Sequence, residues 1–105
     1  MTNKSIAQRL VEITKLFWEI NPTETNLETN PGYPTVFLDF SGHICGLMVR
    51  IYDNGWGTDS KCSYQKSINL DSADAIEKLD EVIERMNVCL KTKKRKEKRQ
   101  NDGRL

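Results

Sequence analysis

The chain has 105 residues, with 16 Lys and Arg against 15 Asp and Glu and a formal net charge of +1. This length suits one domain that folds around a single core without metals or disulfides. Its apolar runs fall far short of the roughly 20 residues that a transmembrane helix needs, which excludes a predicted membrane span. Three cysteines without a C-x-x-C spacing, and no hydrophobic leader, predict free thiols and a cytoplasmic location.

Charge is unevenly distributed along the chain. Residues 1–90 contain eight Lys or Arg and thirteen Asp or Glu, a net of −5, whereas residues 91–105 contain eight and two, a net of +6. Charge of opposite sign in two parts of one chain indicates that the parts have different roles. We therefore expect a single domain over residues 1–90 and a basic, partly disordered C-terminal tail over residues 91–105.

The first predicted element is an amphipathic helix. Apolar residues recur at steps of three and four, the spacing of one helix face, at Ile6, Leu10, Ile13, Phe17 and Ile20. Ser5 followed by Gln8 fits a capping box, although nearby polar residues would also serve as caps. The helix is predicted to end at Asn21, because the residue before Pro22 avoids helical backbone. A long polar connection over residues 23–33 follows.

The middle of the chain, residues 36–69, predicts a three-stranded antiparallel meander. Apolar residues alternate as in strands with one buried face, at Val36, Leu38 and Phe40 in the first strand and at Cys45, Leu47, Val49 and Ile51 in the second. Residues 41–43 form the reversal between them, since their glycine accepts positive φ. Residues 53–59 are rich in turn formers, and residues 62–68 then form a weaker third strand at an edge.

The second predicted helix has Asp71 as its cap and Asp74 in its first turn, where negative charge favours the helix dipole. Its apolar face carries Ala75, Ile76, Leu79, Val82, Ile83, Met86, Cys89 and Leu90. Beyond Leu90 no apolar residue continues the pattern. Residues 91–99 therefore either extend the helix into solvent or fray, and residues 100–105 are predicted to be disordered.

This element order predicts an α+β fold of two layers, α-β-β-β-α, in which two helices pack on one face of a three-stranded antiparallel meander. The other face of the sheet then lies open. By alternation that face carries Phe37, Ile44, Met48 and Tyr52. Because exposed apolar patches mark interaction sites, we expect Phe37, Met48, Tyr52 and the loop residue Trp56 to contact a protein partner or a second copy of the chain.

No group of residues supports a named reaction, metal site or cofactor site. His43, the only histidine, lies in a predicted turn with no nucleophile or carboxylate placed beside it by a motif, so a structural role is favoured. The three cysteines lack a metal-ligand spacing. Asp53 and Asp59 flank a glycine-containing loop, but the alternating carboxylates and final Glu of a calcium loop are absent. We therefore predict a protein that is not an enzyme and has no cofactor.

An alternative function is nucleic-acid binding through the basic tail. Seven of the nine residues from Lys91 to Arg99 are Lys or Arg, which would neutralise several phosphates in a salt-dependent manner. The residues involved would be Lys93, Lys94, Arg95, Lys96, Lys98 and Arg99. Two other interpretations stay open: the tail only aids solubility, or it lies along the acidic body of the same chain or of a partner subunit.

The order helix, three strands, helix is also that of double-stranded RNA binding domains. The acidic start of the second helix argues against that function, because it would repel phosphates. Carboxylates recur along this helix at Asp71, Asp74, Glu77, Asp80, Glu81 and Glu84. They form either a solvated face or an imitation of nucleic-acid charge that fits a basic groove on another protein.

The chain resembles small uncharacterised proteins encoded by bacteriophages and prophages of Gram-positive bacteria in the run Phe40-Ser41-Gly42-His43, then Leu47, Val49, Tyr52 and Asn54-Gly55-Trp56. The resemblance covers roughly the middle quarter of the chain. It implies an accessory phage protein that acts in the host cytoplasm, in a group that includes inhibitors of host defence such as anti-CRISPR proteins. It implies no catalytic residues.

Overall fold

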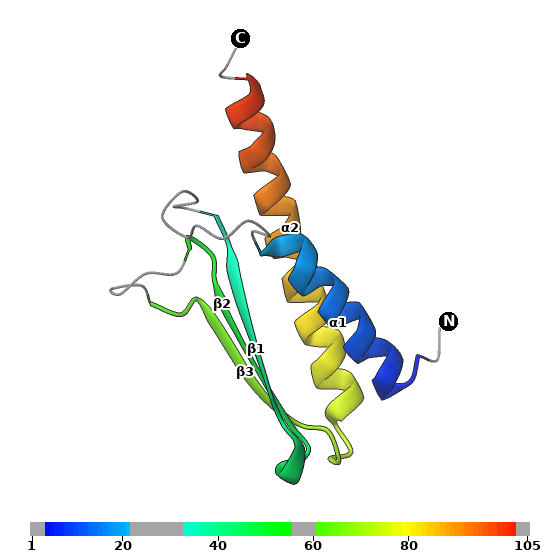
Figure 1. Cartoon of the computed structure of the whole chain (residues 1–105). Helices are drawn as coiled ribbons and strands as arrows, with labels where there is room; N and C mark the ends of the chain where they lie inside the picture. The colour runs from blue at the N-terminus through cyan, green and yellow to red at the C-terminus, as the bar shows by residue number, and fades with distance from the viewer. Residues whose placement is uncertain (1–3, 22–32, 56–60, 103–105) are drawn as a thin grey trace.

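The computed structural model describes residues 4–21, 33–55 and 61–102, with side chains described up to residue 96. Its elements are α1 (Ile6–Ile20), β1 (Thr35–Ser41), the short 3-10 helix η2 (Gly42–Ile44), β2 (Gly46–Tyr52), β3 (Tyr64–Asn69) and α2 (Ala75–Asp102). The strands form one antiparallel sheet in the order β1-β2-β3, and both helices lie against the same face of it (Figure 1). The predicted α+β fold is confirmed.

The register of the sheet brings the alternating apolar residues together. Leu38 pairs with Val49, and Leu47 of β2 pairs with Ile68 of β3, so these side chains lie side by side on the face toward the helices. The core that they form with the helices consists of Ile13, Leu16, Ile20, Val36, Leu47, Val49, Ile51, Ile68, Ala75, Leu79, Val82, Met86, Cys89 and Leu90, with Leu38 packed against it. The periodicities of the sequence therefore locate most of the buried faces of both layers, but Phe40 and Ile76, which were predicted on these faces, are 53% and 44% exposed.

The hairpin between β1 and β2 differs from the prediction at Cys45. This residue was expected on the apolar face of the second strand, but it follows η2 in a left-handed conformation with φ 48°, and its side chain is exposed. Its N–H donates to the carbonyl of Gly42 at 3.3 Å, and its carbonyl accepts from the N–H of Leu70 at 2.8 Å. These bonds make Cys45 the last residue of the turn, and β2 begins at Gly46.

Side chains fix both ends of α1. The Ser5 hydroxyl accepts from the N–H of Gln8 at 3.1 Å, and the Gln8 side chain accepts from the N–H of Ser5 at 2.7 Å, so the predicted capping box is confirmed. At the other end the Asn21 N–H donates to the carbonyl of Phe17 at 3.0 Å. The Asn21 amide also bonds the N–H and the carbonyl of Val36, at 2.7 and 2.9 Å. This residue therefore ties the end of α1 to β1.

α2 begins later than predicted. Asp71 is not its cap, because residues 70–74 form turns and the helix starts at Ala75. The Asn69 side chain accepts from the N–H of Asp71 at 3.0 Å, a local bond that favours a turn over helix. At its other end α2 continues to Asp102, so residues 91–99 extend the helix rather than fray, and the predicted disorder of residues 100–102 is wrong.

α1 and α2 lie side by side and run in the same direction (Figure 1). Arg9 Nε donates to Asp80 Oδ1 at 2.7 Å near the start of both helices, and Lys93 Nζ donates to the carbonyl of Glu19 at 2.7 Å further along. This direction follows from the topology, because β1 and β3 run opposite to α1 and the chain reverses once more between β3 and α2. Neither of these described helices has an apolar stretch that would cross a bilayer.

Candidate functional site

The face of the sheet that points away from the helices carries two aromatic rings and an arginine in one cluster. Phe37 of β1 pairs with Arg50 of β2, and Thr35 pairs with Tyr52. The rings of Phe37 and Tyr52 meet edge to face with centroids 5.6 Å apart, and the Arg50 guanidinium lies 5.2 Å from the Phe37 centroid. Both contacts are favourable aromatic geometries. We call Phe37, Met48, Arg50 and Tyr52 the open-face cluster.

Three of the four side chains predicted to contact a partner, Phe37, Met48 and Tyr52, share this face. The reason is the alternation of side chains along paired strands. The sequence-based prediction missed Arg50, although the same alternation places it between Met48 and Tyr52. Trp56 lies outside the described residues.

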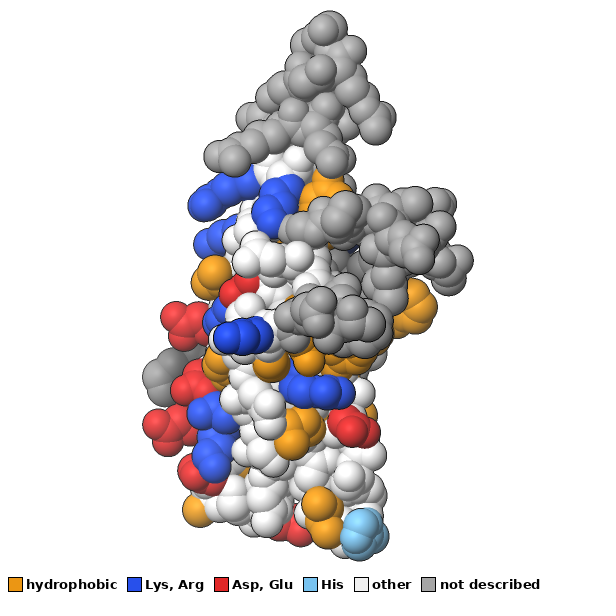
Figure 2. Space-filling view, turned by 90° about the vertical axis from the view of Figure 1, so that its left-hand side faces the viewer, with side chains coloured by type: hydrophobic (Ala, Val, Ile, Leu, Met, Phe, Trp, Pro, Cys, Tyr) orange, Lys and Arg blue, Asp and Glu red, His pale blue; other side chains and the backbone are white. Residues whose placement is uncertain are grey.

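The open-face cluster is more compact than an exposed apolar patch. Tyr52 is only 8% exposed, whereas Phe37, Met48 and Arg50 are half-buried. Figure 2 looks onto this side of the molecule and shows hydrophobic side chains in separate groups, with Lys and Arg side chains between them. The surface therefore presents a small aromatic and cationic anchor with polar surroundings, rather than a continuous apolar patch.

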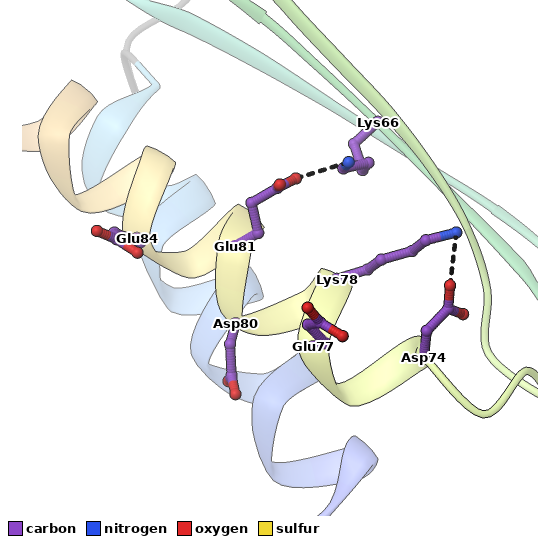
Figure 3. A pocket seen from close by; sticks show the side chains of 7 residues that line it. All are labelled: Lys66, Asp74, Glu77, Lys78, Asp80, Glu81 and Glu84. Carbon is purple, nitrogen blue, oxygen red and sulfur yellow. Dashed lines mark ion pairs between the residues drawn. The ribbon is translucent and has the colours of Figure 1, made fainter.

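A groove of about 420 Å³ runs along the acidic side of α2 beside β3 (Figure 3). The side chains that line it are Lys66, Asp74, Glu77, Lys78, Asp80, Glu81 and Glu84. Two of the carboxylates form ion pairs in it, Glu81 with Lys66 at 2.7 Å and Asp74 with Lys78 at 3.3 Å. In Figure 3 the remaining carboxylates point in different directions from the helix. Because they do not converge, the groove lacks the arrangement of a cation or catalytic site.

Tyr64 of β3 and Glu81 of α2 join the two elements, and their surroundings determine the protonation state of each side chain. The Tyr64 hydroxyl donates to Glu81 at 2.8 Å. The Lys66 ammonium and this hydroxyl hold the pKa of Glu81 below its usual range. Burial, together with the Glu81 carboxylate, raises the pKa of Tyr64 to about 12. Glu81 therefore stays ionised and Tyr64 protonated at neutral pH, which suits a structural tie rather than proton transfer.

The residues considered for chemistry lie apart from the open-face cluster. His43 is exposed in η2 at the end of the hairpin. The pKa of Cys45 is raised by its hydrogen bond with Asp71, and burial raises the pKa of Cys89 to about 11. Both shifts reduce the fraction of reactive thiolate. Among the described residues, no three His, Cys, Asp or Glu side chains come together as metal ligands.

The basic segment of α2, residues 91–96, projects past the end of α1 (Figure 1). The exposed or half-buried cations in it are Lys91, Lys93, Lys94, Arg95 and Lys96. Lys93 contacts the body of the protein through the Glu19 carbonyl. Lys98 and Arg99 belong to the helix, but their side chains lie outside the described part of the structure. The structure thus brings the predicted nucleic-acid residues onto one helical segment, well separated from the open-face cluster.

Comparisons with known proteins found no match among protein-family models, curated proteins or solved structures.

Proposed function

We propose that the chain is a non-enzymatic binding protein that contacts a protein partner through the open face of its sheet. The observation that carries the proposal is the arrangement of the layers: both helices cover one face, and the opposite face presents the open-face cluster. Tyrosine and arginine are the residue types, with tryptophan, that dominate the binding energy of protein interfaces.

The geometry of the cluster favours tight contact at low entropic cost. The Phe37 ring contacts both the Tyr52 ring and the Arg50 guanidinium, so less side-chain freedom remains to be lost on binding. Gln65 and Ser67 of β3 pair with Arg50 and Met48 and are exposed beside them. A polar rim of this kind excludes water around a buried anchor.

The partner that we propose is a host-defence or regulatory component of a Gram-positive bacterium. This part of the proposal rests on the resemblance of the hairpin to phage and prophage accessory proteins. Such a protein would act in the host cytoplasm, where free cysteines stay reduced.

Capture of partners on the immobilised full chain tests the proposal. Extract of a Gram-positive bacterium is applied to the unaltered protein, to Met48→Asp and to Val11→Asp, and the bound proteins are quantified by mass spectrometry. Val11 is the matched control, because it is 54% exposed on α1, on the opposite side of the molecule. Partners that remain on Val11→Asp but are lost from a folded Met48→Asp support the open face. A folded Met48→Asp that captures the same proteins as the unaltered chain contradicts it.

A second candidate function is nucleic-acid binding, and the helical extension of α2 is the observation that favours it. Lys91 and Arg95 are four residues apart on the helix, so their like charges repel and destabilise it in isolation. Phosphates would relieve that repulsion while counterions are released.

Fluorescence anisotropy with duplex DNA, single-stranded DNA and RNA tests this second function. The full chain is compared with a chain that ends at Leu90, the last residue of the core. If the basic segment is the anchor, only the full chain binds, and its affinity falls steeply as salt rises. Equal affinity of the shortened chain would show that the segment is not the binding element.

A further inference from the structure

The outer surface of α2 carries a stripe of charge that changes sign at one exposed apolar residue. The stripe repeats at steps of four and three residues, and all of its members are exposed: Glu77, Glu81, Glu84, Val88, Lys91 and Arg95. We call these residues the outer stripe. At about 100° per residue, they lie opposite the buried face of the helix. Val88, 52% exposed, is the point where acid gives way to base.

From this stripe we infer that two copies of the chain associate through antiparallel pairing of their α2 helices around Val88. Since α2 spans Ala75–Asp102, Val88 lies at its middle, and antiparallel pairing there overlaps the whole length of both helices. Residues equally far before and after Val88 then face each other. Arg95 of the second copy comes opposite Glu81, whose carboxylate is already bonded to Lys66 and Tyr64 of its own chain. The charge contact that carries the pairing is therefore that of Glu84 with Lys91 of the second copy, which occurs twice because of the two-fold symmetry.

Neither the helix dipole nor parallel pairing of two copies accounts for the whole stripe. The dipole favours acid at the start and base at the end of a helix, but its effect falls off within the first and last turns. Here the sorting of charge extends over five turns, from Glu77 to Arg95. Parallel, in-register pairing would place each carboxylate against the same carboxylate of the second copy. Repulsion between these like charges disfavours that arrangement. Antiparallel pairing would also place the part of α2 that extends past α1 against the α2 helix of the second copy.

The association should be weak and sensitive to salt. Exposed ion pairs contribute little individually and are screened by ions. One apolar residue per copy adds little buried area, well below what stable interfaces bury. The pairing does not depend on the open-face cluster, because that cluster lies on the far side of the sheet from the helices (Figure 1). Met48→Asp should leave self-association unchanged, which separates this inference from the proposed function.

Sedimentation velocity of the full chain at low and high salt tests the pairing. The variants are Glu84→Lys, Lys91→Glu and the double charge swap. Neither side chain forms a hydrogen bond or ion pair with another described residue, so the fold should be unaffected. Each single reversal alters two symmetric contacts and should weaken association about tenfold. The double swap should restore the association. Lys15→Glu on α1 changes the charge by the same amount as Lys91→Glu and is the control for that variant.

Cysteine cross-linking then tests the orientation, in a background of Cys45→Ser and Cys62→Ser that removes the exposed thiols. Val88→Cys should form a disulfide between copies under mild oxidation. Lys91→Cys should not, because the two copies of residue 91 would be about 9 Å apart along the helix axis. A chain that is monomeric at low salt, or one that cross-links equally at residues 88 and 91, would overturn the inference.

Discussion

The amide of Asn21 takes the place of a neighbouring strand at the edge of β1. It accepts from the Val36 N–H at 2.7 Å and donates to the Val36 carbonyl at 2.9 Å. Val36 is 2% exposed, so its main-chain groups would otherwise be buried without partners. A single side chain thereby provides hydrogen-bond partners for the main chain of an edge strand and connects this strand to the end of α1.

We predict that Asn21→Ala lowers the free energy of unfolding by about 1–3 kcal/mol, the cost of buried groups left unsatisfied. Asn21→Asp should also destabilise the protein, because it keeps the acceptor but replaces the donor with a charged oxygen. Urea denaturation measures both effects. Thr14→Ala, which removes a hydroxyl bonded to the Leu10 carbonyl on the exposed side of α1, is the control and should change stability by less than about 0.5 kcal/mol. An Asn21→Ala variant as stable as this control would contradict the assignment.

Cys45 shows how a turn residue acquires unusual chemistry from its neighbours. Its left-handed backbone places the thiol near Asp71, whose carboxylate raises the pKa of that thiol by hydrogen bonding. A raised pKa leaves less thiolate at any pH below it.

We therefore predict that Asp71→Asn lowers the pKa of Cys45 and speeds its alkylation at mildly alkaline pH. Iodoacetamide labelling followed by mass spectrometry measures the rate at each cysteine. Cys62, exposed after the loop that precedes β3, should label at the same rate in both proteins and is the internal reference. Unchanged or slower labelling of Cys45 in the variant would contradict the role of Asp71.

At the scale of elements, the packing of α1 against α2 includes a buried arginine. Arg9 is 7% exposed, and it bonds Asp80 through Nε at 2.7 Å and Nη2 at 3.3 Å. A two-pronged contact of this kind is among the stronger ion pairs. Because Asp80 itself remains half exposed, the arginine gains a partner without a fully buried carboxylate.

We predict that Asp80→Asn destabilises the protein by about 1–2 kcal/mol, because it leaves the Arg9 guanidinium buried beside a neutral partner. Lys4→Ala, which breaks the exposed pair with Glu12, should cost less than about 1 kcal/mol. Thermal and urea denaturation of both variants give the comparison. Equal stability of the two variants would mean that the burial of Arg9 adds nothing to the pair.

The elements themselves could be predicted from the sequence, since helix and strand periodicities act over a few residues. The apolar steps of Ile6 to Ile20 and the alternation from Val36 to Ile51 located both buried faces, with Phe40 as an exposed exception. What failed depends on specific hydrogen bonds, both local and long-range, that a periodic pattern does not indicate. Cys45 was expected to be buried because it continues an alternating pattern, yet bonds to Gly42 and Leu70 hold it in a turn.

The candidate site could likewise be predicted only in part: the face that carries it follows from the sequence, but the contacts within it do not. Alternation identified Phe37, Met48 and Tyr52 as neighbours on one face, because side-chain direction follows from strand geometry. It did not indicate that Arg50 would cover the Phe37 ring or that Tyr52 would be nearly buried. Those properties arise from contacts across the sheet, which a single strand does not encode.

At the scale of the whole molecule, the open-face cluster is separated in space from two surfaces of α2 that share Lys91 and Arg95. The open-face cluster lies on the sheet, the outer stripe lies on the opposite side of α2 from its buried face, and the basic segment extends past the end of α1 (Figure 1). Met48→Asp therefore tests the open face without altering α2, and Glu84→Lys tests helix pairing without altering the basic segment, whereas Lys91→Glu changes both surfaces of α2.

Hydroxyl-radical footprinting of the captured complex tests the proposed binding face most directly. Met48 is half-buried on the open face, Met86 is fully buried in the core, and Trp18 is 62% exposed on α1, so one experiment contains the probe and two references. Binding through the open face predicts that oxidation of Met48 slows in the complex while oxidation of Trp18 is unchanged and Met86 stays unmodified. Slower oxidation of Trp18 with no change at Met48 would place the partner on the helices and contradict binding through the sheet.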